Sequence, residues 1–393
     1  TALDVTIQAQ FLDLMRALKE KTGTAIVLIT HDMGVVAEMA DRVLVMQAGA
    51  TVETASVQDI FKKPLRSYTQ ALLAAVPRMG KGREAIAKPT GTPLVSLCDL
   101  VVNYDLKGGI FGRTQARVHA VEGVTFDIYP GETFALVGES GCGKSTIARA
   151  LTGLVPHQGI IEFDGQPLVT TPAARFAASR HMQMVFQDPM AALNGRMRVG
   201  DLVQEPLVIH GVGNRATRRA RAEELFTRVG LAPDALDRYP HEFSGGQRQR
   251  ICIARALALS PKLILADESV SALDVSVQAS VLDLLAELKA EMGMSYLFIS
   301  HDMAVVENIA DRVAVMFLGQ IVETGSSGQI FGNPQHSYTR RLIEAVPHPD
   351  PARVLPRRTH HASDPPSPVR NVGDPPIRSS FRAVASGHLV AVE

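Results

Sequence analysis

Short runs of apolar residues, each bounded by charged or turn-forming residues, recur through the middle of the chain. They read ETFALVG at 132–138, KLILA at 262–266 and SYLFIS at 295–300. Runs of this length are typical of strands buried on both faces of a parallel sheet. Residues 277–288 carry apolar side chains at helical spacing. Strands that alternate with helices predict an α/β fold.

A long internal repeat divides the chain. Residues 1–78 align without a gap on residues 271–348, at a constant shift of 270 positions from Thr1 to Ser271. TALDVTIQA matches SALDVSVQA, and FKKPLRSYTQALLAAVP matches FGNPQHSYTRRLIEAVP. A shared compositional bias would not hold one register over this length, and the separation far exceeds that of stacked solenoid repeats. The first copy therefore corresponds to the rear part of the second, and we expect it to pack poorly.

The remaining segments set the domain boundaries. Residues 79–93, rich in Gly, Pro and Lys, are predicted to be a linker. Residues 94–348 are predicted to form one complete unit. Residues 349–393 contain many Pro, Ser and Arg residues, and we expect a largely disordered tail with a short strand in HLVAVE.

Composition excludes several classes of protein. The 393 residues include 40 Lys and Arg against 40 Asp and Glu, so no overall field attracts nucleic acid or an anionic membrane. The Arg-rich stretch at 214–226 has its charges at helical spacing, which favours a solvated helix face over a nucleic-acid site. Three distant cysteines argue against disulfides, zinc and cysteine-ligated clusters. With no apolar run of about 18 residues and no leader segment, we expect a soluble cytoplasmic protein.

The sequence GESGCGKST at 138–146 satisfies the pattern G-x-x-x-x-G-K-[ST]. Its glycines let backbone N–H groups surround phosphate oxygens at a helix N-terminus. Lys144 is expected to reach the β- and γ-phosphates, and Ser145 to offer its hydroxyl to Mg²⁺. The candidate nucleotide-binding residues in this loop are Gly138, Glu139, Ser140, Gly141, Cys142, Gly143, Lys144, Ser145 and Thr146.

Two further motifs complement the phosphate loop. In LILADE at 263–268, Asp267 suits the outer shell of the Mg²⁺ held by Ser145, and Glu268 is placed to polarise a water against the γ-phosphate. FSGGQRQR, at 243–250, forms a second potential anion cradle at a helix N-terminus. The alternative for Ser244 is an ordinary helix N-cap.

These motifs resemble, in order and spacing, the phosphate loop, signature, acidic strand, D-loop and switch histidine of ATP-binding cassette (ABC) ATPases. The resemblance implies a P-loop NTPase core with an antiparallel β subdomain and a helical signature subdomain. It covers 94–348 as a whole cassette and 1–78 as the portion from the D-loop onward. It also implies a second cassette packed head to tail, so that each ATP lies between one phosphate loop and the partner's signature.

Residue by residue, the resemblance makes Gln187 the glutamine that approaches Mg²⁺ and the attacking water. Asp274 resembles the D-loop aspartate, and His301 the histidine that contacts the γ-phosphate. Tyr104 is our choice for the aromatic residue stacked on adenine, with Phe111 as the alternative. The implied signature residues are Ser244, Gly245, Gly246 and Gln247, and the implied catalytic residues are Glu268, His301, Gln187 and Lys144.

The segments RYPHEFSGGQRQR and PQHSYTRRLIEAVP resemble the ATPases of oligopeptide, dipeptide and glutathione importers. The tail looks closer to the fused two-cassette glutathione branch. This implies ATP and Mg²⁺ as cofactors, and two transmembrane permeases and a periplasmic substrate-binding protein as partners, at the cytoplasmic face of the bacterial inner membrane. Peptide, dipeptide and glutathione stay open as cargo, with nickel as a remote option. Ser269 stands where the family usually has proline.

Two alternatives to the importer stay open. One is a soluble ABC ATPase acting on ribosomes or DNA, against which stands the spacing of about 100 residues between Lys144 and Ser244, too short for a long insertion. The other is a truncated, non-functional product of a fused double cassette. The first copy carries Asp4 and His31 but no phosphate loop, signature or acidic strand, and by itself it is not expected to bind ATP.

Overall fold

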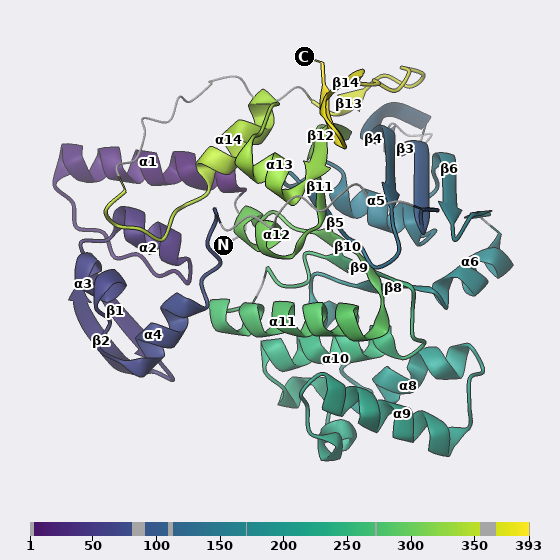
Figure 1. Ribbon diagram of the computed structural model, residues 1–393, viewed down its shortest axis with the longest axis horizontal. Coiled ribbons are helices and arrows are strands. Elements are labelled where there is room, and N and C mark those ends of the chain that lie inside the picture. Colours follow the sequence, from purple (N-terminus) through teal and green to yellow (C-terminus); the bar gives the residue numbers. More distant parts are fainter. Residues whose placement is uncertain are drawn as a thin grey trace.

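The computed structural model of the chain describes residues 4–80, 91–108, 113–169, 171–271, 273–353 and 367–392 (Figure 1). A central sheet runs through the second copy, an antiparallel sheet lies beside it, and helices α8 to α10 form a separate group below (Figure 1). The first copy lies on the opposite side of the molecule from the antiparallel sheet (Figure 1). The α/β fold with β and helical subdomains is confirmed.

The central sheet has eight described strands in the order β14-β15-β12-β11-β5-β10-β9-β8. Its strands are β5 (Thr133–Val137), β8 (Met182–Val185), β9 (Leu263–Asp267), β10 (Ser295–Ile299), β11 (Arg312–Phe317), β12 (Gln320–Ser326), β14 (Phe381–Ala385) and β15 (His388–Ala391). Strands β11, β5, β10, β9 and β8 run parallel to one another. The three predicted apolar runs form β5, β9 and β10, and every residue in these strands is buried.

The antiparallel sheet has the order β13-β4-β3-β6-β7. Its strands are β3 (Val95–Gly108), β4 (Arg113–Ile128), β6 (Gln158–Phe163), β7 (Gln166–Pro167) and β13 (Val369–Arg370). It shares one hydrophobic core with β5 and the helix that follows β5. Phe126 of β4 stacks on Phe134 of β5 with ring centroids 4.7 Å apart. This core fixes the antiparallel sheet against the strand that leads into the phosphate loop.

The helices of the second copy fall into two groups. Those against the central sheet are α5 (Lys144–Leu151), α11 (Val275–Met292), α12 (Met303–Ile309), α13 (Ser327–Gly332) and α14 (Ser337–Ala345). The others are α6 (Pro172–Ser179), α7 (Pro189–Ala192), α8 (Val199–Ile209), α9 (Arg215–Arg228) and α10 (Gly245–Leu257), with 3₁₀ turns at Pro233–Asp237 and Pro240–Glu242. The predicted helix at 277–288 lies inside α11. None of the described helices is long and apolar enough to cross a membrane.

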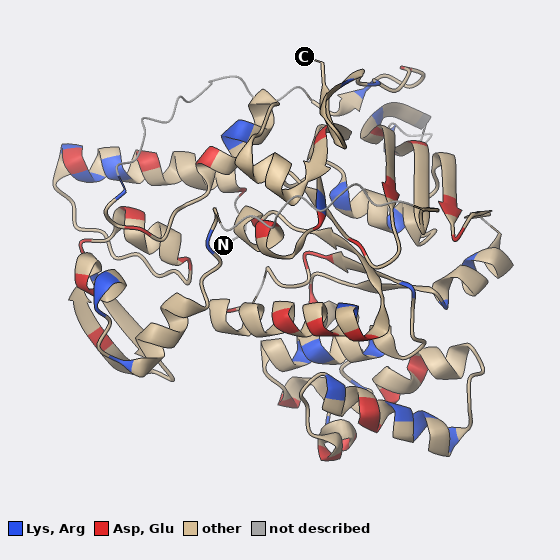
Figure 2. Cartoon of the chain, in the orientation of Figure 1, with Lys and Arg blue, Asp and Glu red and all other residues tan. Residues whose placement is uncertain are grey.

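The Arg-rich stretch forms α9, where basic and acidic side chains lie along the same helix (Figure 2). Arg219 pairs with Glu223 at 3.1 Å and with Asp237 at 3.0 Å, and Arg221 pairs with Glu224 at 2.7 Å. These pairs offset the positive charge of the helix locally.

The first copy repeats the elements of the second at the same shift along the chain. They are α1 (Val5–Thr22), α2 (Met33–Met39), β1 (Arg42–Gln47), β2 (Ala50–Ser56), α3 (Val57–Lys62) and α4 (Ser67–Ala74). One element does not form: residues 25–29, which correspond to β10, are not a strand. Strand β10 pairs with β5 and β9, and the described first copy has no counterpart of either. Val27 and Ile29 are 91% and 94% exposed, whereas Leu297 and Ile299 are fully buried.

The two copies pack on each other reciprocally. Helix α1 of the first copy contacts α14 of the second, and α4 of the first contacts α11 of the second (Figure 1). Because α1 corresponds to α11 and α4 to α14, these are the two halves of one contact, as in a two-fold symmetric dimer. A Cβ on Gly34 would lie 2.6 Å from the carbonyl oxygen of Pro347, so the backbones of the two copies approach closely here.

The prediction of a tail that is disordered apart from one short strand is wrong within residues 367–392, which carry β13 and β14 in addition to that strand. Strand β15 pairs with β12 and thereby covers an edge of the central sheet that would otherwise expose unpaired backbone groups. Arg378 makes two hydrogen bonds to Asp99, of 2.7 and 2.6 Å. The predicted strand in HLVAVE is confirmed as β15. Residues 354–366 of the predicted tail lie outside the described residues.

Candidate functional site

The phosphate-loop sequence connects β5, a strand inside the central sheet, to α5. Gly138 and Gly143 have φ angles of 146° and 107°, in the left-handed region that side chains disfavour. A Cβ on either would lie 2.2 Å from a backbone oxygen, that of Met316 or of Ala120. The surrounding backbone therefore requires glycine at both positions, which explains their places in the motif.

Lys144, the first residue of α5, folds back over the loop. Its Nζ donates hydrogen bonds to the carbonyl oxygens of Gly138 and Glu139, each 2.8 Å long, and the residue is only 4% exposed. Cys142 lies beneath the lysine, 3.7 Å from Nζ, and burial raises the pKa of its thiol. The loop thus presents one buried positive charge beside a row of backbone amides.

Ser145 and Asp267 meet at the base of the loop. The Ser145 hydroxyl donates a 2.7 Å hydrogen bond to Asp267 Oδ1. Asp267 ends strand β9, and burial raises the pKa of its carboxyl, against the hydrogen bond from Ser145. A hydroxyl and a carboxylate at this separation are the hard oxygen ligands that Mg²⁺ prefers, so the pair fits that ion.

Glu268, the residue after β9, holds two predicted site residues together. Its carboxylate accepts a 2.6 Å hydrogen bond from Gln187 Nε2, and His301 Nδ1 lies 3.4 Å away on the other oxygen. Glu268 has a φ of 46°, and its own N–H donates to Ile299 of β10. This left-handed turn directs the carboxylate out of the sheet toward the residues that follow β8 and β10.

Glu268 and His301 stabilise each other's charged form. The hydrogen bond from His301 lowers the pKa of Glu268, against the effect of burial. The same hydrogen bond raises the pKa of His301. Both groups therefore stay charged over a wider pH range than isolated side chains would.

The candidate residues converge because their strands are parallel. The phosphate loop follows β5, Gln187 follows β8, Glu268 follows β9 and His301 follows β10. The carboxyl ends of parallel strands lie at one edge of a sheet, which is where open α/β folds bind ligands. Lys144, Ser145, Asp267, Glu268, Gln187 and His301, which the sequence spreads over more than 150 positions, are thereby gathered at one edge.

The second anion cradle is elsewhere. Ser244 caps α10 through a reciprocal capping box with Gln247, with a 3.0 Å hydrogen bond from Ser244 N to Gln247 Oε1. Ser244 is therefore an N-cap, and the helix start that the sequence predicts as an anion cradle is exposed. Helix α10 packs with α8 and α9 in the lower group, apart from α5 (Figure 1). Gly245 lies open at this helix start, and Gly246 lies against Val277.

The D-loop aspartates of the two copies have different surroundings. Asp274 precedes α11 and is exposed. Its counterpart Asp4 accepts a 2.5 Å hydrogen bond from the backbone N–H of Ser140 in the phosphate loop. Thr6 donates a short hydrogen bond to the Glu139 carboxylate. The first copy therefore reaches the phosphate loop of the second.

Of the two predicted adenine-stacking residues, the structure describes only Tyr104. Tyr104 lies half-buried on β3, where it pairs with Val118 of β4 and packs against the shared core. Phe111 lies outside the described residues. The stacking role of Tyr104 stays a prediction.

One contact to the phosphate loop was missed by the motif analysis. Tyr338 of α14 accepts a 3.1 Å hydrogen bond from the backbone N–H of Glu139. The signal in the sequence was the SYT triplet shared by the two copies at 67–69 and 337–339. Its partner across 199 residues could not be read from local pattern.

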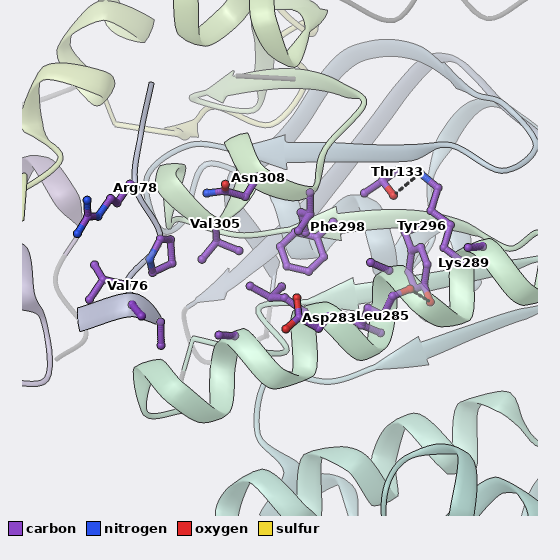
Figure 3. Close-up of a pocket in the computed structure, with 18 of the residues that line it drawn as sticks. Val76, Arg78, Thr133, Asp283, Leu285, Lys289, Tyr296, Phe298, Val305 and Asn308 are labelled. Carbon is purple, nitrogen blue, oxygen red and sulfur yellow. Dashed lines mark hydrogen bonds between the residues drawn. The ribbon is translucent and has the colours of Figure 1, made fainter. Parts of the chain in front are cut away.

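A cavity of about 930 Å³ lies between the two copies (Figure 3). Val76 and Arg78 of the first copy face Phe298, Val305 and Asn308 of the second across it (Figure 3). None of the predicted site residues lines this cavity. It belongs to the contact between the copies and is separate from the phosphate loop.

Comparisons with known proteins identify two families in the chain. Residues 121–271 match the family described as ABC transporter. Residues 52–99 and 322–372 each match the family described as the C-terminal region of oligopeptide/dipeptide transporters. The second family thus matches once in each copy of the repeat.

Similar curated proteins cover the whole chain. It is 51% identical over 416 residues to the glutathione import ATP-binding protein GsiA of Salmonella choleraesuis, an alignment that spans 100% of this chain and 67% of the relative. The protein of the same name from Pectobacterium atrosepticum is 50% identical over the same shares.

Solved structures match the fold. The structure of cbiO1 from Clostridium perfringens, part of the ABC transporter complex cbiONQ, is 28% identical with a TM-score of 0.54, over 61% of this chain and 91% of that chain. The dimeric bacterial ABC transporter cassette MJ0796 is 26% identical with a TM-score of 0.53, over 59% and 98%. Each match thus covers a little over half of this chain.

Proposed function

Because the chain belongs to the ATP-binding proteins of ABC-type peptide importers, we propose that the residues gathered around its phosphate loop form the ATPase site. The chain is an ATPase coupled to the import of peptides or glutathione. The observation that carries the assignment of the site is the convergence of Lys144, the Ser145–Asp267 pair and the Gln187–Glu268–His301 group at one edge of the central sheet.

In the chemical step, Glu268 orients and polarises the attacking water. The hydrogen bond that lowers its pKa keeps it a carboxylate, which accepts hydrogen bonds and can take up a proton from the water. His301 and Gln187 hold this carboxylate on both oxygens. By its resemblance to the switch histidine of the family, His301 would also contact the γ-phosphate. Lys144 and the loop amides stabilise the negative charge that develops on the phosphoryl group.

Mg²⁺ would be held by Ser145, with Asp267 and Gln187 nearby. When bound, it neutralises charge on the β- and γ-phosphates. The supporting observation is the buried Asp267 carboxyl, whose hydrogen bond comes from the Ser145 hydroxyl. Tyr104 would stack on adenine, while Gly138 to Thr146 would surround the phosphates.

A second cassette completes each site. Ser244, Gly245, Gly246 and Gln247 lie at the start of α10, away from the chain's own phosphate loop, as a signature that serves a partner's nucleotide would. Asp4 of the first copy takes the place of a partner's D-loop at Ser140, and Asp274 would do the same for the partner. Residues 1–78 contain no signature sequence, and the one at 244–247 lies away from the chain's own phosphate loop, so we infer that the signature facing Lys144 belongs to another part of a cassette pair.

The whole system would work at the cytoplasmic face of the bacterial inner membrane. Two transmembrane permeases and a periplasmic substrate-binding protein would be its partners. The curated relatives are named for glutathione import, which makes glutathione our proposed cargo. ATP would drive transport by binding the closed cassette pair better than the open one.

The test is the Lys144→Ala variant of the whole chain, assayed for ATP binding by calorimetry and for phosphate release. We expect at least a hundredfold loss of turnover, because a preorganised charge at the phosphates is worth about 3–4 kcal/mol. Lys262→Ala is the control, since Lys262 is an exposed lysine paired with Asp164 before β9. Equal ATP affinity and turnover in the two variants would exclude the proposed site.

A further inference from the structure

The peptide group between Gly138 and Glu139 is held from two sides. Lys144 Nζ donates to the carbonyl oxygens of Gly138 and Glu139, 2.8 Å away in each case. On the other side, the Glu139 N–H donates to the Tyr338 hydroxyl at 3.1 Å. This N–H is therefore engaged by a side chain of α14.

Tyr338 is itself firmly held. It is 2% exposed, and its ring lies 4.4 Å from the ring of Phe317, centroid to centroid. The Arg341 guanidinium lies over the ring at 5.8 Å. Burial raises the pKa of the phenol, which keeps its hydroxyl neutral. A buried, neutral hydroxyl at a fixed position is a suitable acceptor for one backbone amide.

A buried carboxylate fixes the turn that carries Tyr338. Glu323 of β12 accepts hydrogen bonds from the backbone N–H groups of Gln335 and His336, of 2.8 and 3.0 Å. Its Oε1 also lies 2.7 Å from His388 Nε2, on β15 of the tail. His336 Nδ1 in turn accepts from Tyr338 N at 3.1 Å. The tail is thereby linked through Glu323 and this turn to the phosphate loop.

The first copy contains the same turn without the loop. Glu53 accepts from the backbone N–H groups of Leu65 and Arg66, of 2.8 and 3.2 Å, as Glu323 does in the second copy. Tyr68 corresponds to Tyr338 but is only half-buried. The described first copy has no phosphate loop for it to contact. Tyr68 is therefore an internal control for Tyr338: it is the equivalent tyrosine in a copy without a phosphate loop.

We propose that Tyr338 is a positioning residue for the phosphate loop: its hydroxyl fixes the Glu139 peptide, and with it the path of the loop backbone, before the nucleotide binds. The Glu323–His388 pair fixes Tyr338 in turn. The inference rests on the proposed ATP site. Loss of the hydroxyl leaves a partly buried N–H without its acceptor and lets the loop sample other conformations, so binding ATP must then order the loop.

The test compares Tyr338→Phe with Tyr68→Phe in the whole chain. Tyr338→Phe keeps the ring and its contact with Phe317, and we expect the Kd and KM for ATP to rise about five- to tenfold. We expect kcat at saturating ATP to change less than about twofold, because the bound nucleotide restores the loop. Tyr68→Phe should leave Kd, KM and kcat unchanged.

A purely structural role would lower the thermal midpoint of unfolding but leave the Kd for ATP unaltered. That result, or equal Kd values for Tyr338→Phe and Tyr68→Phe, overturns the proposal. His388→Ala is the second variant and tests the same link from the tail, with an expected two- to threefold rise in Kd, of about the size a weakened hydrogen-bond network produces. If Tyr338→Phe does not fold, an unchanged Kd in His388→Ala overturns the proposal.

Lys144→Ala separates this inference from the proposed function. If Lys144→Ala keeps both the ATP affinity and the turnover of Lys262→Ala, the assigned site itself is wrong. If Lys144→Ala loses turnover while Tyr338→Phe has the same Kd for ATP as Tyr68→Phe, the site stands and only the role of Tyr338 fails.

Discussion

Glu268 is the residue on which the proposed chemistry depends most directly. Glu268→Gln removes its charge while keeping nearly the same side-chain shape. The carboxylate accepts from Gln187 at 2.6 Å and lies 3.4 Å from His301. The amide would keep one oxygen for one of these partners and replace the other with an NH₂ group. The variant therefore removes a negative charge and a proton acceptor while leaving the packing of the turn in place.

The expected loss in turnover is a hundredfold or more, equivalent to about 3 kcal/mol in the activation barrier. Binding of ATP should be retained, because the hydrogen bonds of Glu268 go to Gln187 and His301 and not to the phosphate loop. A second consequence concerns His301. Its pKa is raised first of all by the hydrogen bond to Glu268, so this pKa should fall in the variant.

Two measurements check this. Single-turnover hydrolysis of radiolabelled ATP gives the chemical step, with calorimetry for ATP affinity. Titration of His301 by NMR gives its pKa in the two proteins. Glu287→Gln is a matched control, because Glu287 is an exposed glutamate on α11.

Wild-type turnover in Glu268→Gln would remove Glu268 from its catalytic role. An unchanged pKa of His301 would mean that the Glu268–His301 contact does not exist in solution. A hundredfold loss of ATP affinity instead of turnover would refute the separation of binding from catalysis in this site.

The remaining predictions concern the loop backbone and the pH profile. Gly143→Ala places a Cβ 2.2 Å from the Ala120 oxygen at a φ of 107° and should cost about 3 kcal/mol in urea unfolding. Gly141→Ala, at a φ of 79° with nothing within 4 Å, should cost only about 1 kcal/mol, and equal losses would contradict the argument. His301→Ala removes the hydrogen bond that lowers the pKa of Glu268, so this pKa should rise. The acidic limb of kcat/KM should then move to higher pH, a shift that His31→Ala should not produce.

The local pattern of apolar residues was enough to predict the fully buried strands of the central sheet. The runs at 132–138, 262–266 and 295–300 form β5, β9 and β10. A short apolar run bounded by polar residues is typical of a strand buried on both faces. A similar apolar run at 25–29 does not form a strand. AIVLI is as apolar as SYLFI, yet only SYLFI is a strand, because a strand needs neighbours to satisfy its backbone groups.

The tail shows the opposite case, a segment of polar and Pro-rich composition that forms strands. Its Pro-rich composition predicted disorder apart from one short strand. That strand, β15, pairs with the edge strand β12, the further strand β14 pairs with β15, and His388 contacts the buried Glu323. Composition describes what a segment can bury by itself, whereas an edge strand gains its hydrogen bonds from a sheet built elsewhere in the chain.

By itself, the sequence determined the repeat, the phosphate loop, the acidic strand and the family, because each is a local run of residues whose spacing carries the chemistry. Tertiary structure decided which of these residues meet. Gln187, Glu268 and His301 come together because β8, β9 and β10 are parallel and end at one edge. Asp4 and Tyr338 reach the phosphate loop from outside that sheet edge. Such contacts join residues more than 130 positions apart, and only the packing of whole elements brings them within hydrogen-bond distance.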